Sequence, residues 1–254
     1  MKFFSFFLSI ALIALTAISC KKSDTVTPSK TDLAVGESTI QDSVSFTLNG
    51  KSYINLLNPT SYTFNEFGNK GTNLKPTTTP GEFYIGRGNT YWVGSPDSVQ
   101  YYSAYEAVLQ NKAGVIKFSF IRNNNKLDVV KMGSFYLPKT NEDFYKVGDY
   151  QYATDFEREG KEQGIAISFG SLKSNTQSEI YDQPTLTAQD QKGSMFRIKK
   201  ITELKGDQLL YGAPSVMIEA IFEVNLFDKD KNSVKVTNGF LRFKAIEYGN
   251  RWSF

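Results

Sequence analysis

The segment VMIEAIFEVNLF, residues 216–227, decides the fold class of the chain. Every second residue from Ile218 to Leu226 is apolar, whereas Glu219 and Glu223 occupy two of the intervening positions. A period of two is typical of a β-strand, because successive side chains point to opposite faces of a sheet. The segment therefore predicts a strand with one apolar face for the core and one charged face for solvent.

Two further segments, residues 195–204 and 234–246, repeat the alternation with basic side chains in place of acidic ones. The basic residues at the outward positions include Arg197, Lys199, Arg242 and Lys244. Opposite charges on neighbouring strands contribute roughly 0.2–1 kcal/mol a pair and help to set the register. We predict that these three strands form an antiparallel meander with its apolar face in the core.

Short alternating segments also fill the rest of the domain. Asn49-Gly50 separates residues 43–48 from residues 51–54, and it is a strong hairpin signal because both turn residues take positive φ. Further candidate strands are residues 82–87, 99–110, 115–122, 127–137, 148–153 and 164–169. No segment of useful length has a helical period. We therefore predict an all-β domain, an antiparallel β-sandwich or partly closed barrel, with a lipocalin-like barrel as the alternative.

The N-terminus has the features of an export signal. Met1-Lys2 precedes an apolar run over residues 3–18, which is short for a membrane span of ~20 residues. The stretch Leu15-Thr16-Ala17-Ile18-Ser19-Cys20 resembles a bacterial lipobox, in which the cysteine is acylated and becomes the first residue of the mature protein. A plain signal peptide or a transmembrane anchor with a chance cysteine is the alternative. Acylation of Cys20, the only cysteine, would place the protein on the outer membrane, facing either the periplasm or the cell exterior.

The domain organisation follows from composition. Residues 1–19 are a predicted lipoprotein signal peptide, residues 20–43 a polar tether, and residues 44–254 a single all-β domain. Residues 58–81 are rich in Pro, Gly, Thr and Asn, and they predict a long irregular or disordered loop.

Three short motifs carry a family resemblance. The opening motif is FTLNGKSY, residues 46–53, and the closing motifs are EAIF, residues 219–222, and VTNGF, residues 236–240. They resemble those of small Bacteroidetes-type envelope lipoproteins with an all-β domain of unknown function. The resemblance implies an all-β fold and an envelope location, and it supplies no catalytic residues.

Several classes of chemistry are excluded. The chain has no histidine, so imidazole catalysis and histidine-ligated zinc are ruled out. The net charge of +3 does not indicate a nucleic-acid partner. Glu219 and Glu223 are four residues apart on one strand, about 13 Å, which exceeds the ~5–9.5 Å of a glycosidase pair.

Two loop motifs are better explained as turns. Asp228-Lys229-Asp230-Lys231-Asn232 opens like a calcium loop, but Ser233 and Gly239 replace its glycine and glutamate, so a hairpin tip is predicted. Gly86-Arg87-Gly88 lacks the third glycine of a nucleotide-binding loop and indicates a turn or bulge.

Aromatic residues supply the candidate binding site. Tyr91, Trp92, Tyr101, Tyr102 and Tyr105 lie within fifteen residues, and Tyr145, Tyr150 and Tyr152 form a second group. Tyrosine and tryptophan combine a flat apolar face with a polar tip, which suits sugar rings and protein contacts. Aromatics also fill β cores, and Tyr102 must point away from Tyr101 and Tyr105, so at most part of each group can be exposed.

We therefore predict a lipid-anchored binding module for a glycan or an envelope protein, without a cofactor, metal or catalytic site. A carboxylate-dependent polysaccharide hydrolase and a lipocalin-like carrier of an apolar ligand are the alternatives. A further alternative is an outer-membrane barrel, because such barrels often end in an aromatic strand and residues 251–254 are Arg251-Trp252-Ser253-Phe254. Many predicted strands are shorter than the ~9–11 residues that such a barrel needs.

Overall fold

The computed structural model describes residues 41–55, 66–81, 84–87, 90–132, 135–139, 145–175, 190–206 and 215–246. All of these lie in one of the two units into which the chain divides, Thr39–Phe254. Cys20, the predicted leader, most of the predicted tether and the C-terminal aromatic residues lie outside the described residues, so those interpretations stay predictions.

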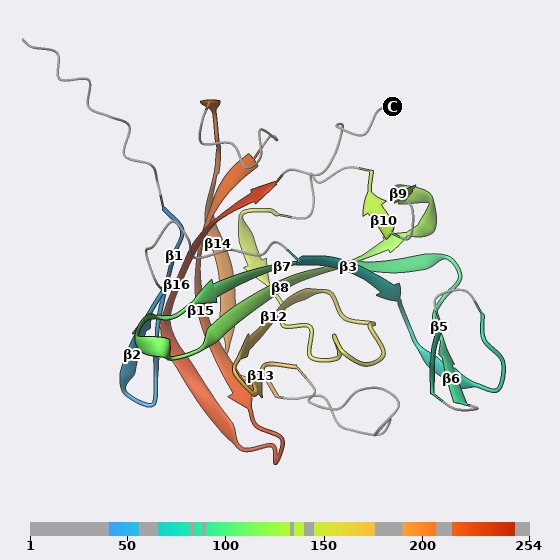
Figure 1. The fold of residues 1–254 in the computed structure, drawn as a ribbon, viewed down its shortest axis with the longest axis horizontal. Coiled ribbons are helices and arrows are strands. Elements are labelled where there is room, and N and C mark those ends of the chain that lie inside the picture. The colour runs from blue at the N-terminus through green and yellow to red at the C-terminus, as the bar shows by residue number, and fades with distance from the viewer. Residues whose placement is uncertain are drawn as a thin grey trace, which may run out of the picture. The chain divides into compact units, whose positions relative to one another are not determined.

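Eleven strands form the main sheet (Figure 1). They are β1 (Ser43–Leu48), β2 (Lys51–Ile54), β3 (Glu66–Gly71), β7 (Ser98–Val108), β8 (Val115–Asn125), β11 (Gly148–Tyr150), β12 (Gly164–Phe169), β13 (Leu172–Lys173), β14 (Met195–Glu203), β15 (Ser215–Phe227) and β16 (Ser233–Ile246). Their order is β2-β1-β16-β15-β13-β12-β8-β7-β3, with β14 on β15 and β11 on β14. The strand pairs in this sheet are antiparallel, so the predicted all-β antiparallel class is confirmed.

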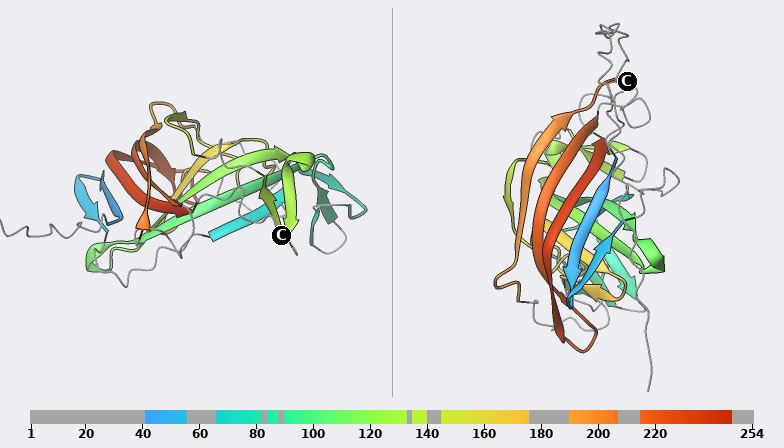
Figure 2. Two further views of the ribbon diagram at one scale, coloured as in Figure 1. Left: turned by 90° about the horizontal axis from the view of Figure 1, so that it is seen from above. Right: turned by 90° about the vertical axis from the view of Figure 1, so that its left-hand side faces the viewer.

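The main sheet folds into two layers, as in a β-sandwich. β1, β16, β15 and β14 lie in one layer, and β12, β8 and β7 lie in the other (Figure 2). The short strand β13 joins them, because it pairs with β12 and, through Lys173, with Phe227 at the end of β15. The apolar faces of the two layers meet in one core.

The core is built largely from aromatic rings. Phe222 of β15 has its ring centroid 5.2 Å from that of Phe118 on β8, and Phe120 lies 5.7 Å from Phe196 on β14. The central side chains are at most 1% exposed; they include Phe118, Phe120, Phe196, Phe222 and Phe243. Edge-to-face packing of this kind adds about 0.5–1.5 kcal/mol a pair to the burial of apolar area.

The predicted meander of residues 195–246 is confirmed. β14 pairs with β15 and β15 with β16, and the even-numbered residues of β15 are buried. On the outer face Glu223 forms an ion pair with Lys235 at 3.0 Å, and Glu219 lies 4.0 Å from Arg242. Acid and base therefore alternate across this face as the sequence indicates.

The outer face of the second layer is also covered. Residues 153–160 lie over β7, β8 and β12, where Phe156 contacts Tyr102 with 5.1 Å between ring centroids. The carboxylate of Asp155 closes this segment by accepting from the backbone N–H of Lys161 at 2.8 Å and of Glu162 at 3.1 Å. Part of the outer face of this layer is therefore buried as well.

Two small sheets extend from the main one. β4 (Lys75–Thr77), β6 (Thr90–Val93) and β5 (Tyr84–Arg87) form a three-stranded sheet in that order, and β9 (Val129–Met132) pairs with β10 (Phe135–Pro138). Single 3-10 turns, η1 (Gln110–Lys112) and η2 (Lys126–Asp128), precede β8 and β9. Within the described part of the chain, no helix is long and apolar enough to cross a membrane.

Three local predictions were wrong. The predicted loop over residues 58–81 contains β3 and β4, which are held by pairing with β7 and β6 rather than by their own composition. The predicted strand 127–137 is the turn η2 followed by the hairpin of β9 and β10. Gly86 and Arg87 lie within β5 rather than in a turn.

Candidate functional site

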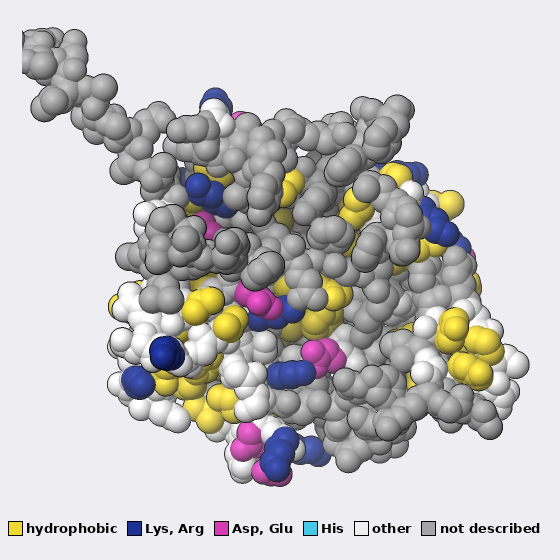
Figure 3. Space-filling view, in the orientation of Figure 1, with side chains coloured by type: hydrophobic (Ala, Val, Ile, Leu, Met, Phe, Trp, Pro, Cys, Tyr) yellow, Lys and Arg dark blue, Asp and Glu magenta, His cyan; other side chains and the backbone are white. Residues whose placement is uncertain are grey.

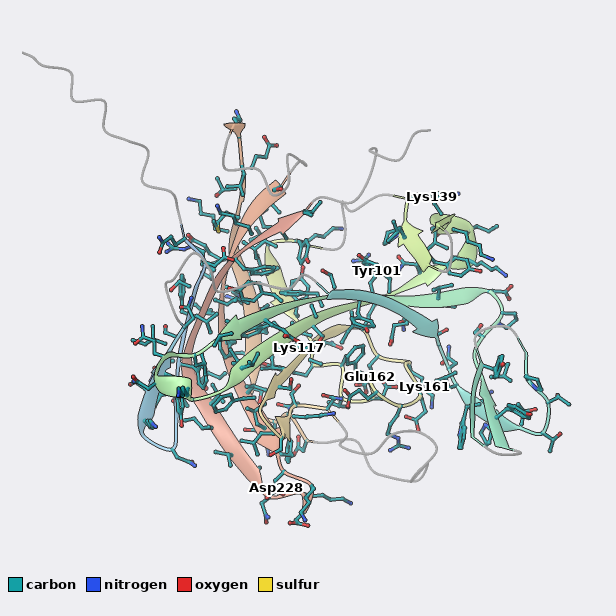
Figure 4. The ribbon with its side chains drawn as sticks, in the orientation of Figure 1. Tyr101, Lys117, Lys139, Lys161, Glu162 and Asp228 are labelled. Atoms are coloured by element: carbon teal, nitrogen blue, oxygen red, sulfur yellow. The ribbon has the colours of Figure 1, made fainter. Side chains whose placement is uncertain are left out.

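The five aromatic residues of the predicted binding patch are distributed over four environments. Tyr101 and Tyr105 project from β7 into the core and are each 1% exposed; Tyr101 is labelled in Figure 4. The ring of Tyr105 lies 4.7 Å from that of Phe243. The prediction that these two residues reach a ligand at the surface is wrong, because the inner face of β7 is covered by the opposite layer.

Burial also fixes the protonation of the core tyrosines. Loss of solvation raises the pKa of Tyr105 well above its ordinary value, and the nearby carboxylate of Asp42 raises it further. Burial likewise raises the pKa of Tyr152, whose hydroxyl donates to the carbonyl oxygen of Glu223 at 2.9 Å. Both phenols stay neutral and serve the fold.

Tyr102 points to the other face of β7, as the alternation predicted. It is partly exposed and packs edge-on against Phe156 with an interplanar angle of 77°. In the second aromatic group, Tyr145 and Tyr150 pack against Phe120 of the core, with centroid separations of 5.1 and 6.2 Å. Neither group forms a single exposed platform.

Tyr91 and Trp92 are separated by the pleat of β6. Trp92 is 5% exposed and is therefore buried on one face of the three-stranded sheet, so the prediction of a ligand contact from Trp92 is also wrong. Tyr91 lies on the opposite face and is partly exposed. Of the residues predicted for the platform on β6, only Tyr91 is available at the surface.

The exposed face of the three-stranded sheet carries a second tyrosine. Tyr84 of β5 is 53% exposed, and its ring centroid lies 5.9 Å from that of Tyr91 with an interplanar angle of 71°. The strand register puts six residues on this face: Lys75, Thr77, Tyr84, Gly86, Tyr91 and Val93. We call these six residues the tyrosine face; Figure 3 shows hydrophobic side chains gathered at this end of the molecule.

A glycine sets the position of the Tyr91 ring. Gly86 is directly opposite Tyr91, and a Cβ atom at residue 86 would lie 2.8 Å from Cδ1 of that ring. The ring can therefore lie across the backbone of β5 only because residue 86 has no side chain. Sequence reasoning missed Tyr84, although Tyr84-x-Gly86 facing Tyr91-x-Val93 is the pattern of a hairpin with two tyrosines on one face.

A groove of about 510 Å³ lies elsewhere, where β8, β11 and the start of β12 diverge. Its lining residues are Phe120, Ile121, Arg122, Lys146, Val147, Gly148, Asp149, Tyr150, Gln151, Gln163 and Gly164. The hydroxyl of Tyr150 donates to the carbonyl oxygen of Lys146 and accepts from its N–H at 2.7 Å, which fixes the loop at one wall. Sequence patterns do not reveal this groove, because its walls come from three separate segments of the chain.

The carboxylates with shifted pKa values have structural partners. Burial raises the pKa of Asp155, whereas the hydrogen bonds that its carboxylate accepts from two backbone N–H groups lower it. Asp228 lies at the tip of the β15–β16 hairpin (Figure 4) and accepts from the backbone N–H of Asp230 and Asn232, each at 2.9 Å. These bonds, with one from the Asn232 side chain, lower the pKa of Asp228. Its loop is the hairpin tip that the sequence predicted.

Among the described residues, no group of three or more Asp, Glu, Cys or His side chains could hold a metal ion. No protein family, no curated protein and no solved structure matches the chain. The candidate sites therefore rest on their own geometry.

Proposed function

We propose that this chain is a lipid-anchored, non-enzymatic binding module of the cell envelope that holds a neutral glycan on its tyrosine face. The observation that carries the proposal is the pair Tyr84 and Tyr91, with 5.9 Å between ring centroids and Tyr84 53% exposed. A sugar ring packs its C–H face on an aromatic ring while its hydroxyls stay in water or bond to neighbouring polar groups. Thr77 and Lys75 are such groups on the same face.

The size of the tyrosine face favours a saccharide over a protein. Its three strands contain three or four residues each. At ~3.3 Å per residue and ~4.8 Å between strands, the face covers roughly 150–200 Å². A standard protein interface buries about 800 Å² on each partner. One or two sugar rings match the smaller area.

The alternatives have less support in the described residues. The hydrolase needs a pair of carboxylates free to act on a substrate, but the described Asp155 and Asp228 use their oxygens to close turns. The carrier needs an empty interior, but the space between the two layers holds packed rings such as Phe118, Phe222 and Phe243. Binding at the surface agrees better with both observations.

Affinity electrophoresis and calorimetry with neutral polysaccharides test this function. We expect the purified domain to bind at least one neutral glycan, and Tyr84→Ala/Tyr91→Ala to weaken that binding by about tenfold or more, because each lost ring contact is worth ~1 kcal/mol or more. Tyr136→Ala is the matched control, since Tyr136 is a partly exposed tyrosine on the separate β9–β10 sheet. Unchanged binding by the double variant would refute the proposal, and capture of an envelope protein instead would replace the glycan.

Membrane attachment is a separate part of the proposal, supported by the sequence around Cys20. The apolar run before this cysteine and the polar residues after it fit a cleaved and acylated N-terminus. Mass spectrometry of the protein from its native host is expected to find Cys20 as the acylated first residue, and Cys20→Ala is expected to release the protein from membranes. An uncut leader with a free thiol would contradict this part alone.

A further inference from the structure

We propose that a surface patch beside the point where the chain enters the domain docks onto anionic lipid headgroups. The patch consists of Ile54, Val108 and Val115, with Lys51 and Lys112 next to them, and all five residues are exposed. We call these five residues the lipid patch. The inference deepens the membrane attachment proposed above and rests on it.

Strand pairing makes the three aliphatic side chains contiguous. Val108 of β7 lies directly opposite Val115 of β8. Asn55, which follows β2, forms an antiparallel bridge with Leu109, and both are at most 5% exposed. The residues before them, Ile54 and Val108, therefore point outward as diagonal neighbours within reach of each other. The exposed fractions are 47% for Ile54, 36% for Val108 and 39% for Val115.

Two exposed lysines lie next to the aliphatic residues. Lys51 begins β2, and its ammonium group lies 5.2 Å from the ring centroid of Tyr53. Lys112 ends the turn η1, which is held beside β2 because the side-chain amide of Gln110 donates to the carbonyl oxygen of Asn55 at 3.2 Å. Figure 1 shows the green coil of η1 beside β2, and Figure 3 shows basic and hydrophobic side chains at this end. Cations around an apolar surface are typical of proteins that bind at the membrane interface.

The charge of the patch is not neutralised by the carboxylates close to it. Glu106 forms an ion pair with Lys117 at 3.3 Å on the outward face of β7 and β8. The carboxylate of Asp42 accepts from the backbone N–H of Lys244 at 3.1 Å. The two lysines of the lipid patch therefore leave a net positive charge, which is complementary to an anionic lipid surface.

The chain from the predicted anchor enters the domain next to the patch. The side-chain amide of Asn55 donates to the carbonyl oxygen of Asp42 at 3.2 Å, and Asn55 directly follows Ile54. The predicted tether from Cys20 to residue 43 has a random-coil span of about 25 Å. An acyl anchor on Cys20 would therefore keep the patch at a high effective concentration near the bilayer. A contact too weak to hold a free protein is then sufficient to orient a tethered one.

The size and the position of the patch favour lipid over a protein partner. A stable protein interface uses about 20–30 residues on each side, whereas the patch offers three aliphatic side chains. In Figure 1, β2 lies at the left end of the domain and β5 and β6 lie at the right end, and the view from above in Figure 2 agrees. Docking through the patch would turn the tyrosine face away from the membrane, toward a glycan.

Methyl NMR on the membrane-tethered protein tests the proposal. The chain without residues 1–19 is coupled through Cys20, its only cysteine, to a maleimide lipid in nanodiscs of phosphatidylcholine and phosphatidylglycerol. A lipid that carries a gadolinium chelate then broadens the methyl signals that approach the bilayer. We expect Ile54, Val108 and Val115 to lose their methyl signals. The signals of Val130 and Val147, which are 44% and 63% exposed elsewhere on the domain, are expected to remain.

Two matched double variants test the role of charge. Lys51→Gln/Lys112→Gln is expected to lower the equilibrium constant for docking by about tenfold or more, so the patch signals return. Lys192→Gln/Lys229→Gln removes two lysines from exposed turns outside the patch, and the broadening is expected to stay as in the unmodified chain. Thermal melting checks that each variant is folded.

Several outcomes would overturn the proposal. It is wrong if Val130 and Val147 broaden as strongly as the patch, if both lysine double variants act alike, or if nanodiscs of phosphatidylcholine alone give equal broadening. Concentration-dependent shifts of the patch methyls without lipid would assign the patch to a second copy of the chain instead. Because the maleimide lipid supplies the anchor, this result does not depend on acylation of Cys20 in the host, which mass spectrometry tests separately.

Discussion

Two pairs of tyrosines, Tyr101 with Tyr105 on β7 and Tyr84 with Tyr91 on β5 and β6, have opposite environments. The first pair is 1% exposed at each residue, whereas Tyr84 is 53% exposed. All four lie on strands and have alternating neighbours. The difference comes from what lies against each strand. The inner face of β7 packs against the opposite layer of the sandwich, whereas the sheet that carries the tyrosine face is paired with no other described sheet.

The exposure of an aromatic residue is therefore a property of the sheet that holds it. β7 pairs on both edges, with β3 and with β8; the opposite layer covers its inner face, and Phe156 covers part of its outer face at Tyr102. The three-stranded sheet buries Trp92 on one face and displays tyrosines on the other. A small sheet that buries one face can therefore offer the other face to a ligand.

The largest expected effect is on the core. Phe222→Ala removes a ring that is 1% exposed and lies 5.2 Å from that of Phe118. We expect the free energy of unfolding in urea to fall by about 3–5 kcal/mol, the usual cost of a large aromatic cavity. The loss of unfolding free energy for Tyr101→Ala is expected to be in the same range. A loss below ~1 kcal/mol for either variant would contradict the packed interior.

The next effect concerns the corner where β12 begins. Gly164→Ala places a Cβ atom against the carbonyl group of Gln151 at a φ of +132°. Strained backbone of this kind costs about 1–3 kcal/mol. Urea unfolding measures the loss, and Gly170→Ala is the control because its φ is also positive but no atom lies within 4 Å. Equal losses for the two variants would show that the close approach at Gly164 has no effect.

A smaller effect separates binding from stability in the tyrosine face. Gly86→Ala is expected to push the Tyr91 ring away, since the added Cβ atom would lie 2.8 Å from Cδ1. Glycan affinity then falls, while the free energy of unfolding changes by less than ~0.5 kcal/mol, as is usual for exposed positions. Calorimetry and urea unfolding on the same sample measure both quantities. Unchanged affinity would show that the orientation of Tyr91 is irrelevant to binding.

The smallest effect is expected on the outer, charged face. Arg197 lowers the pKa of Asp149, so the contribution of this exposed pair to stability is present above the ordinary aspartate pKa and is lost as the pH falls through the lowered value. Arg197→Gln is expected to return the pKa of Asp149 toward its ordinary value in an NMR titration. A pKa that does not move would contradict the ion pair.

The sequence predicts the strands of the core better than it predicts the tyrosine face and the groove. The alternation in β15 and the Asn49-Gly50 turn, with φ of 50° and 73°, are local signals, and both are confirmed. β3 and β4 have weak local signals and are held by pairing with distant strands. The exposure of Tyr84 and the position of the groove depend on which strands face each other, and periodicity alone does not contain that information.

The most direct test of the central claim is an NMR titration of the domain with the neutral glycan that it binds. We expect the changes in amide and side-chain chemical shift to be confined to residues 75–77, 84–86 and 91–93, on the three strands of the tyrosine face. Shifts that centre on the β8–β11 groove instead, or no saturable shift with any neutral glycan, would contradict it.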